Sequence, residues 1–216
     1  MNSASEIRCL LRFGPRNFVE EFCYTGRLYM NTLKYFKTLE ANDELRSDPS
    51  EGLISSHAAS KTQLFVESQG NLLPIRNLIG QLKLSDKRDE EINVFSLYAI
   101  TENIIDVDDR VFSFGGCAAL IENSYELLQR LKKALENSDW DYRVGLVDYV
   151  DKDNYSGEMG AFRKYSDLEY QNEFRIAIHT KKNAPLTDLY LGDLRDITCL
   201  IDTQTVKRLP KGLHKT

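Results

Sequence analysis

The sequence lacks the signatures of three common classes of enzyme. No GxxxxGKS or GxxxxGKT phosphate loop, HExxH zinc motif or GxSxG nucleophile elbow occurs in its 216 residues. The three histidines, His57, His179 and His214, have neither the spacing of metal ligands nor an evident cysteine partner. The sequence therefore argues against a zinc hydrolase and a serine–histidine hydrolase, and we expect no metal in the site.

Cysteine pairs and long apolar runs are also absent. The four cysteines, Cys9, Cys23, Cys117 and Cys199, are far apart and form no CxxC pair, which indicates free thiols in a reducing compartment. No apolar run approaches membrane-spanning length, and the first residues lack the apolar core of a targeting signal. We therefore expect a cytoplasmic protein with no membrane partner.

The length and composition are typical of one folded domain. The chain is 42% hydrophobic and 28% charged, and 216 residues are enough for one full core. Its formal net charge of -5 creates no general attraction for nucleic acid, so any such contact would need a local basic patch. We expect a single domain over residues 1–216.

Strand and helix patterns alternate in the first part of the chain. Ile7–Phe13 is predicted to be a strand in which Arg12 must meet a partner or an anion. A short helix is expected to be capped by Asn17 and to end at Gly26. A strand over Arg27–Met30 and a helix over Leu33–Leu39, capped by Thr32, are then expected.

The middle of the chain is more polar. We predict a polar loop over residues 40–62, a hairpin formed by Gln63–Glu67 and Leu72–Ile75, and a charged linker over 85–91. A loose basic tail is expected over 207–216.

The second half is rich in predicted strands. Ile92–Ile100 is apolar almost throughout and should be covered on both faces, with Ser96 bonded most commonly to a backbone carbonyl. Further elements are expected at Cys117–Ile121, Tyr125–Glu136 (a helix capped by Ser124), Tyr142–Val150, Leu189–Leu191 and Ile197–Ile201. The expected fold is therefore a compact, strand-rich α+β domain with several short helices.

The stretch Tyr170–Ile178 is the centre of the functional argument. Phe174 and Ile178 belong to a period-2 apolar pattern, which predicts a strand with one buried face. Glu173 would lie at the start of this strand, level with Gln171. Its carboxylate and the Gln171 amide could then bind the two hydroxyls of a diol. The alternative is a half-exposed edge whose polar residues face water.

Carboxylates, arginines and aromatic residues are the remaining candidates for chemistry. Eleven Tyr and ten Phe residues, together with arginine, suit a planar anionic ligand. Carboxylates could bind ribose hydroxyls. The alternative is that the aromatic residues belong to the core.

The order of these residues resembles the ADP-ribosyltransferase fold. The strand with Arg12, the helix ending at Gly26 and the segment 26–36 resemble its amino-terminal half, and Gln171-Asn172-Glu173 resembles the strand that carries its catalytic glutamate. The segment Arg46-x-Asp48-Pro49-x-Glu51-Gly52, Val147-x-Tyr149, Lys164 and Glu173–Ile176 are also similar to poorly characterised bacterial proteins associated with mobile elements. The resemblance implies split sheets and NAD as co-substrate.

The resemblance also implies roles for individual residues. Arg12 would hold the NAD phosphates or brace the pocket, and Tyr29, Tyr35 and Phe36 would stack beside nicotinamide. Glu173 would stabilise the oxocarbenium-like transition state, and Gln171 would orient the acceptor. Asn31 and Thr32 stand where the family carries a Ser-Thr strand start, which is a departure, and Ser96 is a second candidate for that serine.

Three functions remain open. The first is an NAD-dependent mono-ADP-ribosyltransferase, a bacterial toxin or phage-defence effector that modifies a protein or nucleic acid and has an antitoxin as a candidate partner. The second is a non-catalytic binding or inhibitor protein. The third is a nuclease with magnesium held by Asp48, Glu51 and Glu173.

Two spatial predictions accompany these functions. Arg12 and Glu173 are expected on neighbouring strands that face one cleft. Arg46, Asp48 and Glu51 are expected in an ordered loop beside that cleft, with internal salt links.

Overall fold

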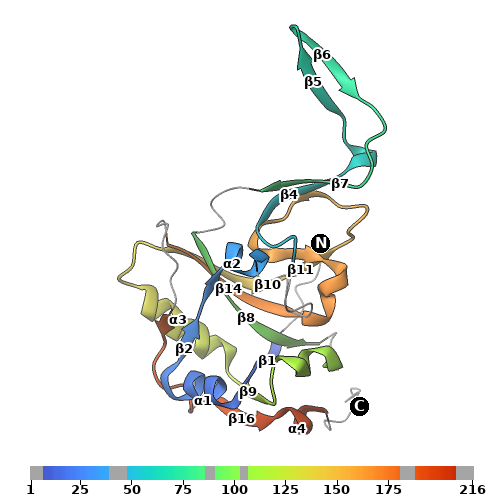
Figure 1. The fold of residues 1–216 in the computed structure, drawn as a ribbon. Helices are drawn as coiled ribbons and strands as arrows, with labels where there is room; N and C mark the ends of the chain where they lie inside the picture. Colours follow the sequence, from blue (N-terminus) through green and yellow to red (C-terminus); the bar gives the residue numbers. More distant parts are fainter. Residues whose placement is uncertain (1–6, 39–47, 86–90, 103–106, 181–187, 208–216) are drawn as a thin grey trace.

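Seven antiparallel strands form the main sheet of the protein (Figure 1). The computed structural model describes residues 7–38, 48–85, 91–102, 107–180 and 188–207. The strand order is β10-β14-β8-β1-β9-β16, and β3 pairs with β8 beside this path. The strands are β1 (Ile7–Gly14), β3 (Asn31–Thr32), β8 (Ile92–Thr101), β9 (Cys117–Ile121), β10 (Asp141–Leu146), β14 (Glu173–His179) and β16 (Thr198–Asp202).

Two helices pack on one face of this sheet. They are α1 (Arg16–Thr25) and α3 (Ser124–Leu135), whose leucines at positions 127, 131 and 135 recur every four residues and are buried. Phe22 of α1 stacks on Phe95 of β8 with ring centroids 6.0 Å apart. These side chains belong to the largest hydrophobic core, which fixes the position of β8 between its neighbours.

Smaller elements surround the main sheet. Two shorter helices are α2 (Leu33–Thr38) and α4 (Thr203–Lys207). The minor sheets contain β2 (Arg27–Tyr29) with β15 (Asp188–Tyr190), β4 (Leu53–Ala58) with β7 (Gln81–Ser85) and β12 (Ser156–Glu158), β5 (Leu64–Ser68) with β6 (Asn71–Ile75), and β11 (Asp148–Val150) with β13 (Arg163–Tyr165). The β5–β6 hairpin extends away from the rest of the molecule (Figure 1).

The main sheet splits beside β8. On one side, β14 pairs with β8 from Ile92 to Tyr98. On the other side, β1 pairs with the end of β8 from Tyr98 onward, and β3 pairs with Asn93 and Val94. Within the described residues, neither β1 nor β3 is in register with residues 95–97, so the sheet opens there.

Many of the predicted elements are confirmed. The strands at Ile7–Phe13 and Ile92–Ile100 and the hairpin around Ser68–Asn71 occur as expected, and β8 is largely buried. Gly26 ends α1 in a left-handed conformation with φ of 64°. Thr32 caps α2, because its hydroxyl accepts a hydrogen bond from the Tyr35 N–H at 3.1 Å. The fold is a compact, strand-rich α+β domain with several short helices.

Two predicted helix caps were wrong. Pro15 stands at the N-cap of α1 without a side-chain cap, and Asn17 lies within the first turn. Asn123, not Ser124, caps α3, because its carboxamide oxygen accepts from the Glu126 N–H.

Two predicted boundaries also differ from the structure. The polar loop 40–62 contains β4, and its residues 40–47 lie outside the described part of the chain. The single strand expected over Tyr142–Val150 is divided at Val147, because β10 pairs with β14 whereas β11 pairs with β13. Most of the linker 85–91 and all of the tail after Lys207 lie outside the described residues.

No helix in the described part of the chain combines the length and apolar character needed to cross a bilayer.

Candidate functional site

A cleft of about 650 Å³ lies where the main sheet splits. All but one of the predicted site residues line it: Arg12, Tyr29, Asn31, Tyr35, Phe36, Ser96, Gln171 and Glu173. The exception is Thr32, which is buried and caps α2 instead. The tertiary structure therefore brings together residues from β1, β8 and β14 that are up to 161 positions apart.

Glu173 is held from several sides at the base of this cleft. Its Oε2 accepts hydrogen bonds from Ser96 Oγ at 2.7 Å and from Arg175 Nε at 2.6 Å, and its Oε1 accepts from Lys164 Nζ at 2.6 Å. Its backbone N–H donates to the Tyr149 hydroxyl at 3.0 Å. Glu173 is only 8% exposed, so the half-exposed edge considered from the sequence is not what forms here.

The pairing of β14 with β8 explains this arrangement. Glu173 and Arg175 are two residues apart and therefore project from the same face of β14. Ser96 is the register partner of Arg175 on β8, which places its hydroxyl beside the Glu173 carboxylate. A carboxylate, and not the expected backbone carbonyl, is thus the partner of Ser96.

A buried network of charges continues behind Glu173. The Arg175 guanidinium forms a two-point salt bridge with Glu51, with Nη1–Oε1 and Nη2–Oε2 both 2.7 Å. Lys164 Nζ lies 3.6 Å from a Glu51 oxygen and 3.9 Å from an Asp48 oxygen. Three carboxylates thus share two cations, and all five side chains are buried.

The network shifts the pKa values of its carboxyl groups in opposite directions. Burial alone would raise the pKa of Glu173, but the charges of Arg175 and Lys164 outweigh it and hold that pKa well below its usual range. The same balance lowers the pKa of Glu51. For Asp48, burial and the negative charge of Glu51 dominate and raise the pKa to about 6.

Gln171 lies beside Glu173 but not on the same strand. It ends a 3₁₀ turn over Ser166–Gln171, and Asn172 follows in a left-handed conformation with φ of 35°. The strand predicted over 170–178 therefore begins only at Glu173. Lys164 Nζ donates to Gln171 Oε1 at 2.8 Å and to Glu173, so one ammonium group holds the amide and the carboxylate together.

Arg12 and Glu173 line the same cleft, but the predicted strand arrangement was wrong. β8 lies between their two strands. The register also places Arg12 on the sheet face of Phe95, where its guanidinium carbon lies 4.7 Å from the ring centroid, whereas Glu173 is on the opposite face. Both reach the cleft because the sheet is open beside residues 95–97.

The segment from Asp48 to Glu51 is an ordered turn next to the cleft. Asp48 Oδ1 accepts from the Ser50 N–H at 2.8 Å, and the Asp48 carbonyl accepts from the Glu51 N–H at 2.8 Å. The acidic side chains pair with Lys164 and Arg175 of distant segments. Arg46, the third residue of this prediction, lies outside the described residues.

Aromatic side chains line the entrance of the cleft. Tyr29 is 49% exposed and Tyr35 is 42% exposed, so both rings can receive a ligand. Arg27 lies over the Tyr29 ring at 5.4 Å and is paired with Glu21 and Asp188. The cleft thus combines stacking surfaces, the Arg12 guanidinium and a deeply held carboxylate.

The sequence analysis missed the roles of Lys164 and Tyr149 at this site. The sequence did indicate that Arg175 and Glu173 are neighbours, because residues two apart on a strand project from the same face. No local sequence pattern placed Lys164 or Tyr149 at the site, and only the resemblance pointed to them. Their segments reach Glu173 only through the tertiary fold.

No protein-family model, curated protein or solved structure matches the chain. Among the residues that the structure describes, no group of three or more His, Cys, Asp or Glu side chains is arranged to hold a metal ion. The function is therefore inferred from the geometry and the sequence resemblance.

Proposed function

We propose that the protein is an NAD-dependent mono-ADP-ribosyltransferase and that Glu173 is its catalytic carboxylate. The observation that carries this proposal is the 2.7 Å hydrogen bond from Ser96 to Glu173 at the base of a cleft that Arg12 also lines. Arg12, Ser96 and Glu173 are the candidates for the arginine, serine and glutamate roles that the resemblance implies, and all three line one cavity.

The cleft is suited to a dinucleotide in size and chemistry. Its volume of about 650 Å³ lies within the roughly 300–1,000 Å³ of small-molecule sites. Arg12 would neutralise the phosphates, and Tyr29, Tyr35 and Phe36 would offer faces to a planar ring. Glu173 would meet the ribose attached to nicotinamide.

The hydrogen bonds of Glu173 leave room for that ribose. Three described side-chain donors reach its two oxygens, and a carboxylate has about four acceptor positions. Oε1 receives only the Lys164 bond among these and can accept another from a ribose hydroxyl. Because the pKa of Glu173 is strongly lowered, the group is ionised at physiological pH.

The reaction would be a transfer at the ribose C1′ atom. The bond between C1′ and the nicotinamide nitrogen breaks, and its electron pair leaves with neutral nicotinamide. Positive charge develops on the ribose, where Glu173 stabilises it. A nucleophilic atom of the acceptor bonds to C1′ and releases its proton, with Gln171 placed beside Glu173 to orient that atom.

Ser96 fits the serine role better than Asn31 or Thr32. Its hydroxyl contacts Glu173 directly, whereas Thr32 caps a helix and does not line the cleft. Asn31 remains a lining residue and could contact the ligand at the edge of β3.

The deep burial of Glu173 also suits a non-catalytic protein, which is the main alternative. A carboxylate that is 8% exposed and bonded to two cations is also what a purely structural network requires. The protein would then be a non-catalytic binding or inhibitor protein. A magnesium nuclease has less support, because Lys164 and Arg175 already neutralise the carboxylates that would hold the metal.

The proposed biological role rests on the sequence resemblance alone. It comprises action as a bacterial toxin or phage-defence effector, with a protein or nucleic acid as acceptor and an antitoxin as partner.

A transfer assay with labelled NAD distinguishes the three candidate functions. The full chain is incubated with NAD labelled in the adenylate part and with cell extract, with EDTA or with magnesium. We expect label on a macromolecule in both conditions, and digestion with protease or nuclease then identifies the acceptor class. No transfer and no nicotinamide release would contradict the proposal, and magnesium-dependent loss of nucleic acid would favour the nuclease.

A further inference from the structure

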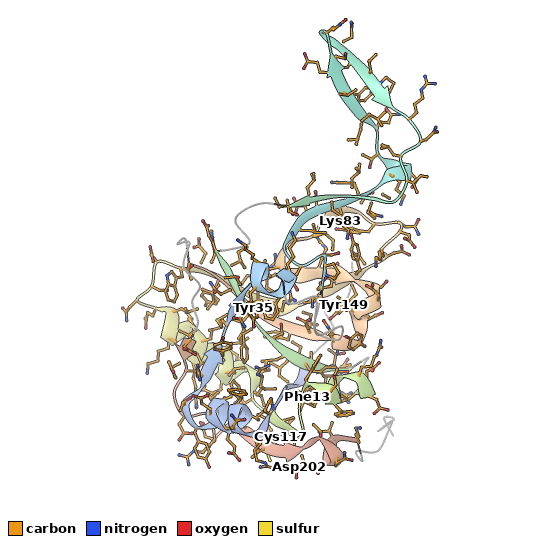
Figure 2. The ribbon with its side chains drawn as sticks, viewed as in Figure 1. Phe13, Tyr35, Lys83, Cys117, Tyr149 and Asp202 are labelled. Carbon is orange, nitrogen blue, oxygen red and sulfur yellow. The ribbon has the colours of Figure 1, made fainter. Side chains whose placement is uncertain are left out.

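The hairpin of β5 and β6, here called the arm (64–75), lies outside the candidate site. It extends away from the main sheet, and its side chains stand on both sides of the ribbon (Figure 2). Gln69 and Gly70 both have positive φ angles at its turn, 51° and 77°, as a type I′ turn requires. The arm is joined to the body through β4 and β7.

Both faces of the arm are apolar and exposed. Val66 lies opposite Leu73 on one face, and Phe65 lies opposite Pro74 on the other. Leu72 is 68% exposed, and no strand other than β5 and β6 belongs to this sheet in the described structure. An isolated two-stranded hairpin is only marginally stable in water, and exposed apolar surface of this kind marks an interaction site.

The two edges of the arm differ in their ability to pair. In a two-residue hairpin, the pair next to the turn is hydrogen-bonded and the pairs then alternate, so the Phe65–Pro74 pair points its backbone groups outward. Pro74 has no N–H, which blocks the outer edge of β6. The outer edge of β5 keeps the N–H groups of Phe65 and Glu67.

We propose that the arm is a dimerisation element and that a second copy of this chain occupies the open edge of β5. The two β5 strands would pair antiparallel about a two-fold axis at Val66, with Phe65 opposite Glu67 of the partner subunit. The outer edges of the joined sheet are then both β6 edges with Pro74. The assembly therefore closes at two chains instead of extending into a fibre.

The apolar area of the arm fits this partner. Six large apolar side chains of the arm and the loop after it are 45% to 95% exposed: Phe65, Val66, Leu72, Leu73, Ile75 and Ile79. Of these, Phe65 and Val66 belong to β5, at its open edge. Pairing of the two β5 strands would set Val66 beside Val66 of the partner subunit and so remove part of this apolar surface from water.

The distribution of charge and polarity also favours a second copy. In the proposed register, Glu67 of each chain lies opposite Phe65 of the partner subunit, so like charges do not meet across the seam. A lipid surface suits the arm less well, because the turn over 68–71 is polar and would enter the bilayer first.

Sedimentation of the full chain tests the proposal. We expect a dimer at micromolar concentration. Val66→Lys places two ammonium groups at the axis and should weaken the dimer by at least about 100-fold, because like charges opposite each other destabilise strand pairs. Tyr125→Lys is the matched control, since Tyr125 is 71% exposed on α3, and it should leave the dimer intact. An unchanged melting temperature shows that the body remains folded.

Cross-linking tests the register. In a Cys199→Ser background, Val66→Cys should form a disulfide between chains on mild oxidation, because the axis pair is a close, non-hydrogen-bonded one. Gln69→Cys at the turn should not. A wild-type chain that stays monomeric, a dimer that survives Val66→Lys, or a monomer whose arm binds lipid vesicles would each overturn the proposal.

Discussion

The Ser96 hydroxyl donates a 2.7 Å hydrogen bond to the Glu173 carboxylate and so links β8 to β14 at the base of the cleft. The two residues are 77 positions apart. The strand register alone brings them together, because Ser96 pairs with Arg175, two residues after Glu173. The central strand of the sheet therefore helps to orient the proposed catalytic group.

Ser96→Ala is expected to impair transfer more than stability. A hydrogen bond to a charged group contributes about 1.5–3 kcal/mol, and Lys164 and Arg175 still hold Glu173 in the variant. We expect the rate of ADP-ribose transfer to fall about tenfold or more, while the melting temperature falls by only a few degrees. Ser113→Ala, which removes an exposed hydroxyl bonded to the Arg110 carbonyl, is the control. Equal turnover of the two variants would exclude a role for Ser96.

Glu173→Gln is expected to slow transfer by about two to three orders of magnitude, or roughly 3 to 4 kcal/mol. The amide keeps the size of the side chain but loses the negative charge that faces the developing cation. NAD affinity should change much less, because this interaction strengthens only in the transition state. The fold should survive, since Asp48 and Glu51 still neutralise the two buried cations.

Glu169→Gln serves as the control, because Glu169 is exposed in the turn before Gln171. Turnover of Glu173→Gln and of this control is measured beside their melting temperatures. Full turnover with a lowered melting temperature would make Glu173 a structural residue.

The Glu51–Arg175 pair should show strong coupling in a double-mutant cycle. Arg175→Met leaves buried carboxylates without their main cation and should lower the free energy of unfolding by about 3–5 kcal/mol. In the double variant Glu51→Met/Arg175→Met, the free energy of unfolding should fall by less than the sum of the decreases in the two single variants. Urea unfolding of the four proteins measures this difference.

The exposed Lys152–Asp167 pair provides a reference for that cycle. Its atoms are 3.2 Å apart, but both side chains are more than half exposed. Its coupling should stay below about 1 kcal/mol. Similar coupling for both pairs would contradict the burial of the Glu51–Arg175 bridge.

Asp48 should make the stability of the fold depend on pH. Its pKa is raised from 3.8 to about 6, so the favourable contribution of the protonated group is complete below about pH 4 and is lost as the pH rises through 6. Asp48→Asn is neutral at every pH and should raise the free energy of unfolding at pH 8 by about 1–3 kcal/mol. Near pH 4, Asp48→Asn and the wild-type chain should have the same free energy of unfolding.

Urea unfolding at pH 4, 6 and 8 checks this dependence. Asp109→Asn is the control at an exposed position and should show no such trend. A gain for Asp48→Asn that is the same at all three pH values would contradict the raised pKa.

The sequence was sufficient to predict those elements whose pattern is local to one strand or one turn. The apolar run of Ile92–Ile100 predicted the buried strand β8, and the alternation after Glu173 predicted β14. The polar turn after Glu67 predicted the β5–β6 hairpin. These patterns depend on the period of one strand or on one turn, and they need no knowledge of distant partners.

Other local patterns were ambiguous. Tyr170 and Gln171 looked like the start of β14, but Asn172 adopts a left-handed conformation and a 3₁₀ turn precedes the strand. The acidic segment after Arg46 looked like a solvated loop by composition, yet Asp48 and Glu51 are buried. Burial of charge depends on the cations that other segments supply.

The sequence by itself therefore determined the strands of the core and the position of Glu173 at the start of one of them. Only the tertiary structure decided that Ser96, Lys164 and Arg175 surround that carboxylate, and that Arg12 reaches the same cleft from the other face of the sheet. The physical reason is that side-chain periodicity is fixed within each strand, whereas the register between strands, and the opening between β1 and β3, depend on how the whole core packs.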